Sequence, residues 1–317
     1  MTLPHALLVA GPTASGKSAL ALALAERLRG TIVNADSMQV YRELRVLTAR
    51  PTPQDEARVP HKLYGVRPAT EPGSVAWWRA EALAAMESAR QENRLPILTG
   101  GTGLYFAALT HGLADIPDPG PQARAEARAL LAELGAPGLH ARLAAEDPTT
   151  GGRLKPNDSQ RIARAWEVWR GTGSGLAAWQ ARRGTPAPWR FTAIQLDPPR
   201  EALRAAIATR FAAMLAEGAL DEVRALLAQH LDPALPAMRA HGVPELSACL
   251  RGDMTLPEAS RRTALVTGQY TRRQATWFRH HPLSEGRTHT IHARFAELTQ
   301  FSERILDETV AFVHPPG

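Results

Sequence analysis

One stretch near the start of the chain, LLVAGPTASGKSALALALAERL, constrains the fold more than any other. Within it, Gly11, Gly16, Lys17 and Ser18 satisfy the pattern G-x-x-x-x-G-K-[ST] of a phosphate-binding loop. An apolar run precedes this pattern and a strong helix former follows it. The pattern therefore has the strand–loop–helix context that a phosphate-binding loop needs.

The segments that follow alternate between strand and helix. TIVNA ends just before Asp36, residues 74–92 are rich in Ala and Glu as in a helix, and LPILTGGTGLYF runs from a strand through a glycine turn. This alternation predicts an α/β fold of the P-loop NTPase type, with a parallel sheet and helices on both faces. Ligands of such sheets bind beyond the carboxyl ends of the strands. Gly11–Ser18, Asp36 and Gly100–Gly103 should therefore meet at one edge.

Two proline-rich segments mark the expected domain boundaries. IPDPGP, at 116–121, and GTPAPW, which precedes the strand FTAIQLD, enclose only helical patterns and turns. We expect residues 1–118 to form the first part of the α/β core and residues 119–190 an all-helical insertion. Residues 191–317 should complete the core and add C-terminal helices.

Composition limits the classes of protein and of partner. The chain has 317 residues, 44% of them hydrophobic, which is enough for a packed core. No apolar run is long enough to span a bilayer, and the N-terminus lacks the features of a signal peptide. One cysteine, Cys249, excludes an internal disulfide and fits the cytoplasm. A net charge of +6 favours a polyanionic partner, although a solvated basic surface explains it equally well.

The loop residues have defined chemical roles in binding phosphate. Glycines let backbone N–H groups point inward, and the following helix adds partial positive charge at its N-terminus. Lys17 neutralises phosphate, and the Ser18 hydroxyl is placed to bind Mg²⁺. Asp36 could bind Mg²⁺ or act as a general base, but it could equally cap the next helix. The glycines of TGGTGLY indicate either close approach of a ligand or a tight turn.

Two later segments carry arginines in helical patterns. In NDSQRIARAWEVWRG, the residues Gln160, Arg161 and Arg164 share one face, opposite an apolar face. That polar face could contact a phosphate backbone or simply be solvated.

In YTRRQATWFRHH, Arg272, Arg273 and Arg279 surround Trp277 and Phe278. Arginines interleaved with aromatics suit phosphate contacts and base stacking, but the aromatics could also belong to the core.

Taken together, GPTASGKS, NADSMQVY, the strand into GGTGLY, NDSQRIARAWEV and RQATWFR resemble the bacterial tRNA dimethylallyltransferase family, also called tRNA isopentenyltransferase. The resemblance runs from about residue 6 to about residue 282. It implies a P-loop-type core with a helical insertion. It also implies transfer of a dimethylallyl group from dimethylallyl diphosphate to the exocyclic amine of the adenosine 3′-adjacent to the anticodon in tRNA.

The resemblance also implies roles for individual residues. Thr13 should donate to the bridging oxygen of the donor, and Asp36 should act as the base for the adenine amine. The loop would bind the donor diphosphate with Mg²⁺ on Ser18, and the enzyme would be a monomer. The diphosphate-binding residues are Gly11, Pro12, Thr13, Ala14, Ser15, Gly16, Lys17 and Ser18. The residues expected to contact the anticodon stem-loop are Asp36, Ser37, Met38, Gln39, Thr102, Arg124, Gln160, Arg161 and Arg164.

The sequence departs from the family pattern in a few places. AHGVPEL has Val243 and Pro244 where a Tyr and a Lys are usual, PHKLYG has Lys62 where a second His is common, and Trp166 replaces a Leu. Other functions also fit a phosphate-binding loop. An ATP-dependent small-molecule kinase is the alternative, and a nucleic-acid-binding ATPase is a weaker one.

Overall fold

The computed structural model describes residues 3–182, 184–284, 287–295 and 300–313. The chain divides into two compact units, one of residues 1–110 with 187–317 and one of residues 111–186. The functions expected for the segments 1–118, 119–190 and 191–317 stay predictions.

The first unit is built on an open sheet of six strands in the order β3-β2-β4-β1-β5-β6. Every neighbouring pair is parallel. The parallel α/β sheet expected from the sequence is therefore confirmed. The strands are β1 (His5–Ala10), β2 (Gly30–Asn34), β3 (His61–Lys62), β4 (Leu95–Gly100), β5 (Arg190–Leu196) and β6 (Thr288–Ile291).

The central strands are buried on both faces, as their near-continuous apolar sequences require. Because successive side chains of a strand point to opposite faces, Leu7 and Leu8 of β1 belong to different cores. Leu8 packs in a core with the fully buried Trp78, while Leu7 packs in the core that contains Leu20 of the helix after the phosphate-binding loop.

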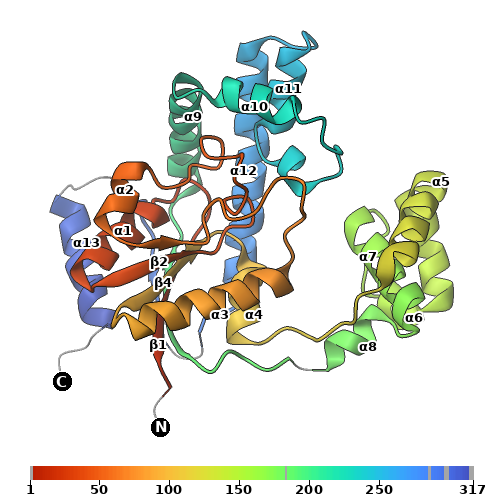
Figure 1. Ribbon diagram of the computed structural model, residues 1–317, viewed down its shortest axis with the longest axis horizontal. Helices are drawn as coiled ribbons and strands as arrows, with labels where there is room; N and C mark the ends of the chain where they lie inside the picture. The colour runs from red at the N-terminus through yellow and green to blue at the C-terminus, as the bar shows by residue number, and fades with distance from the viewer. Residues whose placement is uncertain (1–2, 183, 285–286, 296–299, 314–317) are drawn as a thin grey trace. The chain divides into compact units, whose positions relative to one another are not determined.

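Helices surround this sheet (Figure 1). They are α1 (Lys17–Arg27), α2 (Pro53–Arg58), α3 (Val75–Gln91), α4 (Gly103–Thr110), α9 (Arg200–Ala216), α10 (Ala219–Leu227), the 3-10 helix η1 (Pro236–Arg239), α11 (Val243–Leu250), α12 (Leu256–His280) and α13 (Gln300–Val313). In the part of the chain that the structure describes, no helix is both long and apolar enough to cross a membrane.

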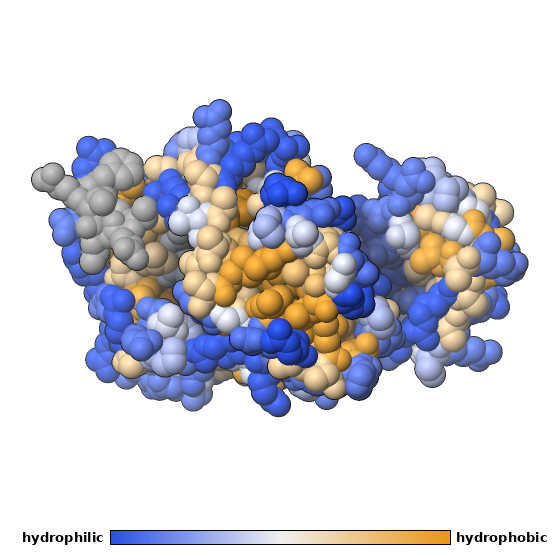
Figure 2. Space-filling model, turned by 90° about the horizontal axis from the view of Figure 1, so that it is seen from above, coloured by the Kyte–Doolittle hydropathy of each residue, from blue (hydrophilic) through white to orange (hydrophobic). Residues whose placement is uncertain are grey.

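Apolar side chains also reach the surface of the first unit. Seen from above, they gather near its middle with hydrophilic residues around them (Figure 2). Concentrations of this kind are typical of surfaces that contact a ligand or a partner.

The second unit is helical, with α5 (Gly120–Glu146), α6 (Pro148–Gly151), α7 (Ser159–Thr172) and α8 (Leu176–Ala181). α5 bends at Gly135, which has φ 66°, two residues before Pro137. Trp166, one of the departures from the family pattern, is 2% exposed in the core of this unit, and its Nε1 donates to Glu126 at 3.3 Å. The larger ring therefore has a packing role and a partner for its N–H group.

Candidate active site

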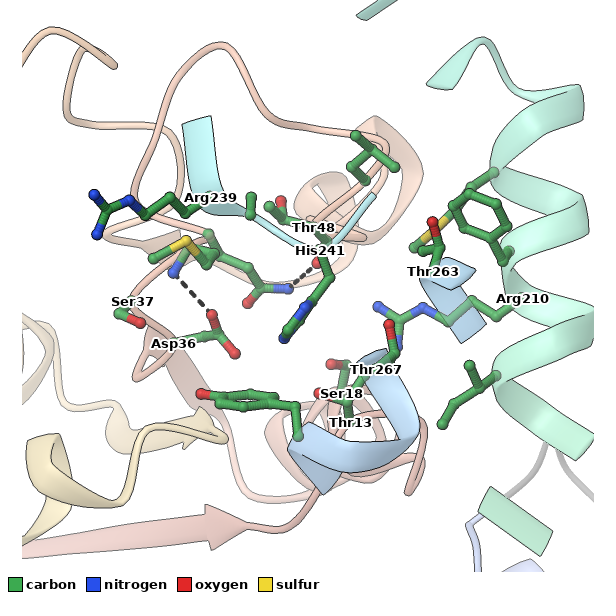
Figure 3. A pocket seen from close by; sticks show the side chains of 18 of the residues that line it. Thr13, Ser18, Asp36, Ser37, Thr48, Arg210, Arg239, His241, Thr263 and Thr267 are labelled. Carbon is green, nitrogen blue, oxygen red and sulfur yellow. Dashed lines mark hydrogen bonds between the residues drawn. The ribbon is translucent and has the colours of Figure 1, made fainter. Parts of the chain in front are cut away.

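A cavity of about 270 Å³ lies beyond the carboxyl ends of β1 and β2 (Figure 3). Its polar wall includes Lys17, Asp36 and Arg210, together with Thr13 and Ser18 from the phosphate-binding loop. Its apolar wall is formed by Leu47, Ile207, Phe211 and Met214. The cavity thus has both charged and apolar lining.

The phosphate-binding loop is held in a conformation that its sequence makes possible. Gly16 has φ +91°, and a Cβ at this position would lie 1.8 Å from the carbonyl oxygen of Phe295. Ala14 also has a positive φ, 67°. Of the eight loop residues, Thr13, Lys17 and Ser18 line the cavity. The others, Gly11, Pro12, Ala14, Ser15 and Gly16, shape the loop around it.

Lys17 brings an ammonium group into a crowded position. Its Nζ donates to the Pro12 carbonyl oxygen at 3.3 Å. Burial lowers the pKa of Lys17 to about 8; the Asp36 carboxylate opposes this shift and the Arg210 guanidinium adds to it. An anion bound beside Lys17 favours the charged form, so anion binding and protonation of Lys17 are coupled.

Asp36 lies two residues after the end of β2 and points into the cavity (Figure 3). The Asn34 side chain supports it by accepting from the Asp36 N–H at 2.8 Å and donating to the Asp36 carbonyl oxygen at 3.0 Å. Oδ1 of Asp36 accepts from the Met38 N–H at 2.9 Å. The carboxylate therefore has a fixed orientation, as a residue that accepts a proton or binds a cation needs.

The loop after Asp36 is anchored by two side chains. Glu222 on α10 accepts from the backbone N–H groups of Arg45 and Val46 at 2.7 Å each, and from Leu47 at 3.0 Å. Gln39 donates through Nε2 to the carbonyl oxygens of two later residues of the loop. Ser37, Met38 and Gln39 also line the cavity, so the predicted site residues from Asp36 to Gln39 are brought together there.

Thr102 does not line this cavity but supports a residue that does. Its hydroxyl accepts from the Ser37 N–H at 3.0 Å, and its own N–H donates to the Ala35 carbonyl oxygen at 3.2 Å. These bonds fasten the β4 turn to the segment that follows β2. The structure therefore gives Thr102 a supporting contact with Ser37.

The glycines of the β4 turn make room for other parts of the protein. A Cβ on Gly100 would lie 2.0 Å from the Ala35 carbonyl oxygen, and one on Gly101 would lie 2.1 Å from Nε2 of Gln274. A Cβ on Gly103 would lie 2.1 Å from the ring of Trp277. These glycines therefore allow close packing against the β2 end and α12, a reason that neither interpretation of the turn had named.

α12 contributes both core and cavity residues. Phe278 is 3% exposed and packs near Phe106, so this aromatic belongs to the core. Trp277 lies flat on the His281 ring, with centroids 4.3 Å apart. Arg273 lines the cavity beside the phosphate-binding loop. The other two arginines of this segment, Arg272 and Arg279, line a second cavity of about 500 Å³.

Comparisons with known proteins agree with this architecture. Residues 39–281 match the family model described as IPP transferase. A protein of Granulibacter bethesdensis named tRNA dimethylallyltransferase is 65% identical over 98% of both chains. A protein of the same name from Gluconobacter oxydans is 59% identical over 99% of this chain and 95% of its own. The chain belongs to the IPP transferase family.

Solved structures show the same fold as this chain. The full-length tRNA isopentenylpyrophosphate transferase of Bacillus halodurans matches with a TM-score of 0.69 and 29% identity, over 98% of this chain and 97% of that one. A eukaryotic dimethylallyltransferase acting on tRNA matches with a TM-score of 0.82 and 23% identity, over 99% of this chain and 80% of that one, which shows likeness of fold.

The remaining predicted site residues lie in the helical unit of this family member. Gln160, Arg161 and Arg164 are exposed on α7, as their spacing predicted. Two of them have acidic neighbours, because Arg161 pairs with Asp158 at 3.6 Å and Arg164 with Glu167 at 3.2 Å. Arg124 on α5 pairs with Asp118. Exposed pairs of this kind contribute little to stability, so these arginines can exchange their partners for phosphates at small cost.

Several cavity residues were missed from the sequence. Arg210 lines the polar wall, where burial lowers its pKa and the Asp36 carboxylate opposes that shift. A signal was present, because Leu203, Ile207, Arg210 and Met214 share one face of α9 and an arginine interrupts an otherwise apolar stripe.

Tyr270 and His241 were also missed. Their rings lie 4.9 Å apart at the cavity. Burial, with the Asp36 carboxylate as the second cause, raises the pKa of Tyr270 to about 12, so it keeps its proton at neutral pH. Burial lowers the pKa of His241, which favours its neutral form. Both rings therefore offer neutral hydrogen-bonding groups to a ligand beside Asp36.

The pKa of Lys17 predicts how anion binding depends on pH. Below pH 8 Lys17 of the free protein is charged and affinity for inorganic pyrophosphate should be full; above it the free protein loses this charge and affinity should fall. Calorimetric titration between about pH 7 and pH 9.5 measures this. Lys17→Met corrects for the ionisation of pyrophosphate itself, and equal pH dependence of the two proteins would contradict the prediction.

Proposed function

We propose that this chain transfers a dimethylallyl group from dimethylallyl diphosphate to the exocyclic amine of the adenosine 3′-adjacent to the anticodon in tRNA, and releases diphosphate. The observation that carries the proposal is one cavity lined by the loop residues Thr13, Lys17 and Ser18, by Asp36, and by apolar side chains. Relatives of high identity carry the name tRNA dimethylallyltransferase. They do not favour the alternative of an ATP-dependent small-molecule kinase.

The two parts of the donor match the two kinds of side chain that line the cavity. The diphosphate binds to the loop N–H groups and to the cations Lys17 and Arg210. The five-carbon allylic tail packs against the apolar wall that contains Leu47 and Phe211. A nucleoside triphosphate has no hydrocarbon tail to pack against that apolar wall.

Magnesium fits the chemistry of this site. Mg²⁺ prefers oxygen ligands and commonly combines one or two protein groups with phosphate oxygens and waters. The Ser18 hydroxyl and the Asp36 carboxylate offer such oxygens at the cavity. Groups of three or more His, Cys, Asp or Glu that would hold an ion alone are absent from the described part of the chain. When bound on Ser18 beside the diphosphate, the ion stabilises negative charge on the leaving group.

Bond breaking places charge where the loop can stabilise it. As the allylic C–O bond breaks, its electron pair stays on the bridging oxygen and the carbon gains cationic character. The Thr13 hydroxyl donates to that oxygen, and Lys17 and Arg210 stabilise the diphosphate. These groups are in place before reaction, so little reorganisation is needed. The cavity must exclude water, which would otherwise capture the reactive carbon.

Asp36 acts as the base for the acceptor. The adenine amine is a poor nucleophile because its lone pair is delocalised into the ring. Removal of its proton by Asp36 as the C–N bond forms makes the attack feasible. The adenosine must leave the anticodon stack to reach the cavity. Ser37, Met38 and Gln39, which follow Asp36 along the cavity, are the residues proposed to hold the base.

The proposed contacts with tRNA use polar and basic residues that are not among the residues lining the first cavity. Arg124, Gln160, Arg161 and Arg164 are proposed to contact the anticodon stem-loop from the helical unit. Arg272 and Arg279, with Arg200 in the second cavity of the first unit, are further candidates for phosphate contacts. We expect a monomer that works in the cytoplasm.

The function is tested by incubating the protein with labelled dimethylallyl diphosphate, bulk tRNA and Mg²⁺. Label should enter tRNA without ATP, because the proposed donor carries its own leaving group. Dependence of labelling on ATP, with release of ADP, would contradict the proposal and favour the kinase alternative.

The variant Asp36→Asn distinguishes the two possible roles of Asp36, general base and metal ligand. Asn keeps the size and one acceptor oxygen but cannot take a proton at neutral pH. Transfer in a single turnover should slow by about a hundredfold or more, with donor and tRNA binding nearly unchanged. The rate is measured over a series of Mg²⁺ concentrations. Recovery of the rate at high Mg²⁺ would assign Asp36 as a metal ligand instead.

Arg161→Ala with Arg164→Ala tests the polar face of α7. The double variant should bind tRNA less tightly and with a weaker salt dependence, because each lost phosphate contact lowers the slope of log K against log salt by roughly 0.9 or less. Donor affinity should not change. Arg90→Ala with Arg251→Ala is the matched control, since it removes two exposed, acid-paired arginines of the first unit. Equal loss of tRNA affinity in both double variants would show a nonspecific charge effect.

A further inference from the structure

One buried amide on α12 joins the two glycine-containing loops of the site. Gln274 is 4% exposed, and its Oε1 accepts from the Thr13 N–H at 2.9 Å and from the Thr13 hydroxyl at 3.2 Å. Its Nε2 donates to the Gly101 carbonyl oxygen at 3.0 Å. A backbone N–H can only donate and a carbonyl oxygen can only accept. The two backbone partners therefore fix which end of the amide faces Thr13.

This orientation has a consequence for the Thr13 hydroxyl. The hydroxyl carries one proton, and in the free protein that proton points to Gln274. The oxygen atom is thereby held in one place beside the donor site. When negative charge develops on the bridging oxygen, the proton turns to it by rotation about one bond, while the hydroxyl oxygen stays where Gln274 placed it.

We propose that Gln274 is a positioning residue for the transfer reaction, which holds the Thr13 hydroxyl ready for the leaving group. This rests on the proposed function. The allylic C–O bond breaks with its electron pair on the bridging oxygen, Thr13 donates to that oxygen, and Gln274 touches neither substrate. Gln274 contributes by holding the Thr13 hydroxyl oxygen in place before the reaction. Loss of Gln274 should therefore slow the chemical step and affect donor binding much less.

The glycine turn provides independent support. The Nε2 of Gln274 occupies the space that a Cβ on Gly101 would need, with a separation of 2.1 Å. The backbone of Gly101 is not left-handed, so the need for glycine here comes from the amide of Gln274 and not from a positive φ. The turn and the amide therefore form one unit, and a change in either should disturb Thr13.

The decisive experiment measures single-turnover transfer at saturating donor for Gln274→Met in three backgrounds: Thr13, Thr13→Ser and Thr13→Ala. Threonine is stiff at χ1, whereas serine depends more on its hydrogen-bond partner. Gln274→Met should slow transfer about tenfold with Thr13 and more with Thr13→Ser, but less than about threefold with Thr13→Ala, where no hydroxyl is left to position. The donor Kd should change by less than about threefold.

A purely structural role predicts a different pattern. The Thr13 N–H bond to Gln274 is present in all three backgrounds, so a structural role gives the same fold-change in each and would overturn the proposal. An unchanged rate in the Thr13 background would overturn it too. If the chain with no substitutions transfers no label to tRNA, the proposed function itself fails, which distinguishes the two failures.

A second variant covers the case in which Gln274→Met does not fold. Gly101→Ala adds one methyl group that would lie 2.1 Å from Nε2 of Gln274 and 3.4 Å from the Gly11 carbonyl oxygen, so the main displacement falls on the amide, and it should show the same dependence on background. Gly268→Ala is the matched control, because it makes the same change on α12 where nothing lies within 4 Å. Slow transfer by Gly101→Ala together with normal transfer by Gly268→Ala supports the proposal. If Gly101→Ala slows transfer by the same factor in the Thr13 and Thr13→Ala backgrounds, the proposal is contradicted.

Discussion

The conformation of the phosphate-binding loop is the constraint on which the rest of the site depends. Its backbone is held by hydrogen bonds from segments far away in the sequence. Arg294 donates to the Ala14 carbonyl oxygen at 2.9 Å, and the Phe295 N–H donates to the Ser15 carbonyl oxygen at 3.0 Å. Gln274, on α12, accepts from the Thr13 N–H of the loop. With its carbonyl groups taken up by the protein, the loop can direct N–H groups toward an anion.

Electrostatics then decides what this cavity accepts. Two cations, Lys17 and Arg210, and one carboxylate, Asp36, share a small volume. The lowered pKa values of both cations show that burial outweighs their attraction to Asp36. A diphosphate compensates for that burial because it brings several negative charges to the two cations. The negative charge of the diphosphate would repel the Asp36 carboxylate unless the carboxylate faces the acceptor or a metal ion lies between the two. The variant Asp36→Asn distinguishes these two arrangements.

The sequence predicted the parallel sheet and the meeting of three loops at its edge, because local patterns and the rules of parallel sheets determine both. The pattern placed Asp36 at this edge, and the resemblance to the family named Ser37, Met38 and Gln39; all four line the cavity. The sequence did not reveal Arg210 or Gln274. Their importance comes from contacts between helices and loops distant in the chain, which no local pattern records. The arginines and aromatics of RQATWFR were noticed first, although the amide between them makes the contact with the loop.

A signal for α12 was nevertheless present in its spacing. Thr263, Thr267, Tyr270 and Gln274 follow the i, i+4, i+7, i+11 spacing that apolar residues take on the buried face of a helix. Thr263, Thr267 and Gln274 are at most 8% exposed, and Thr263, Thr267 and Tyr270 line the cavity. Burying polar groups is costly unless they have partners. A polar stripe at core spacing therefore indicates that the helix packs against a site rather than against a core. Along α12 that site runs from the cavity wall to the phosphate-binding loop, so one helix holds the loop and borders the cavity in which the donor reacts.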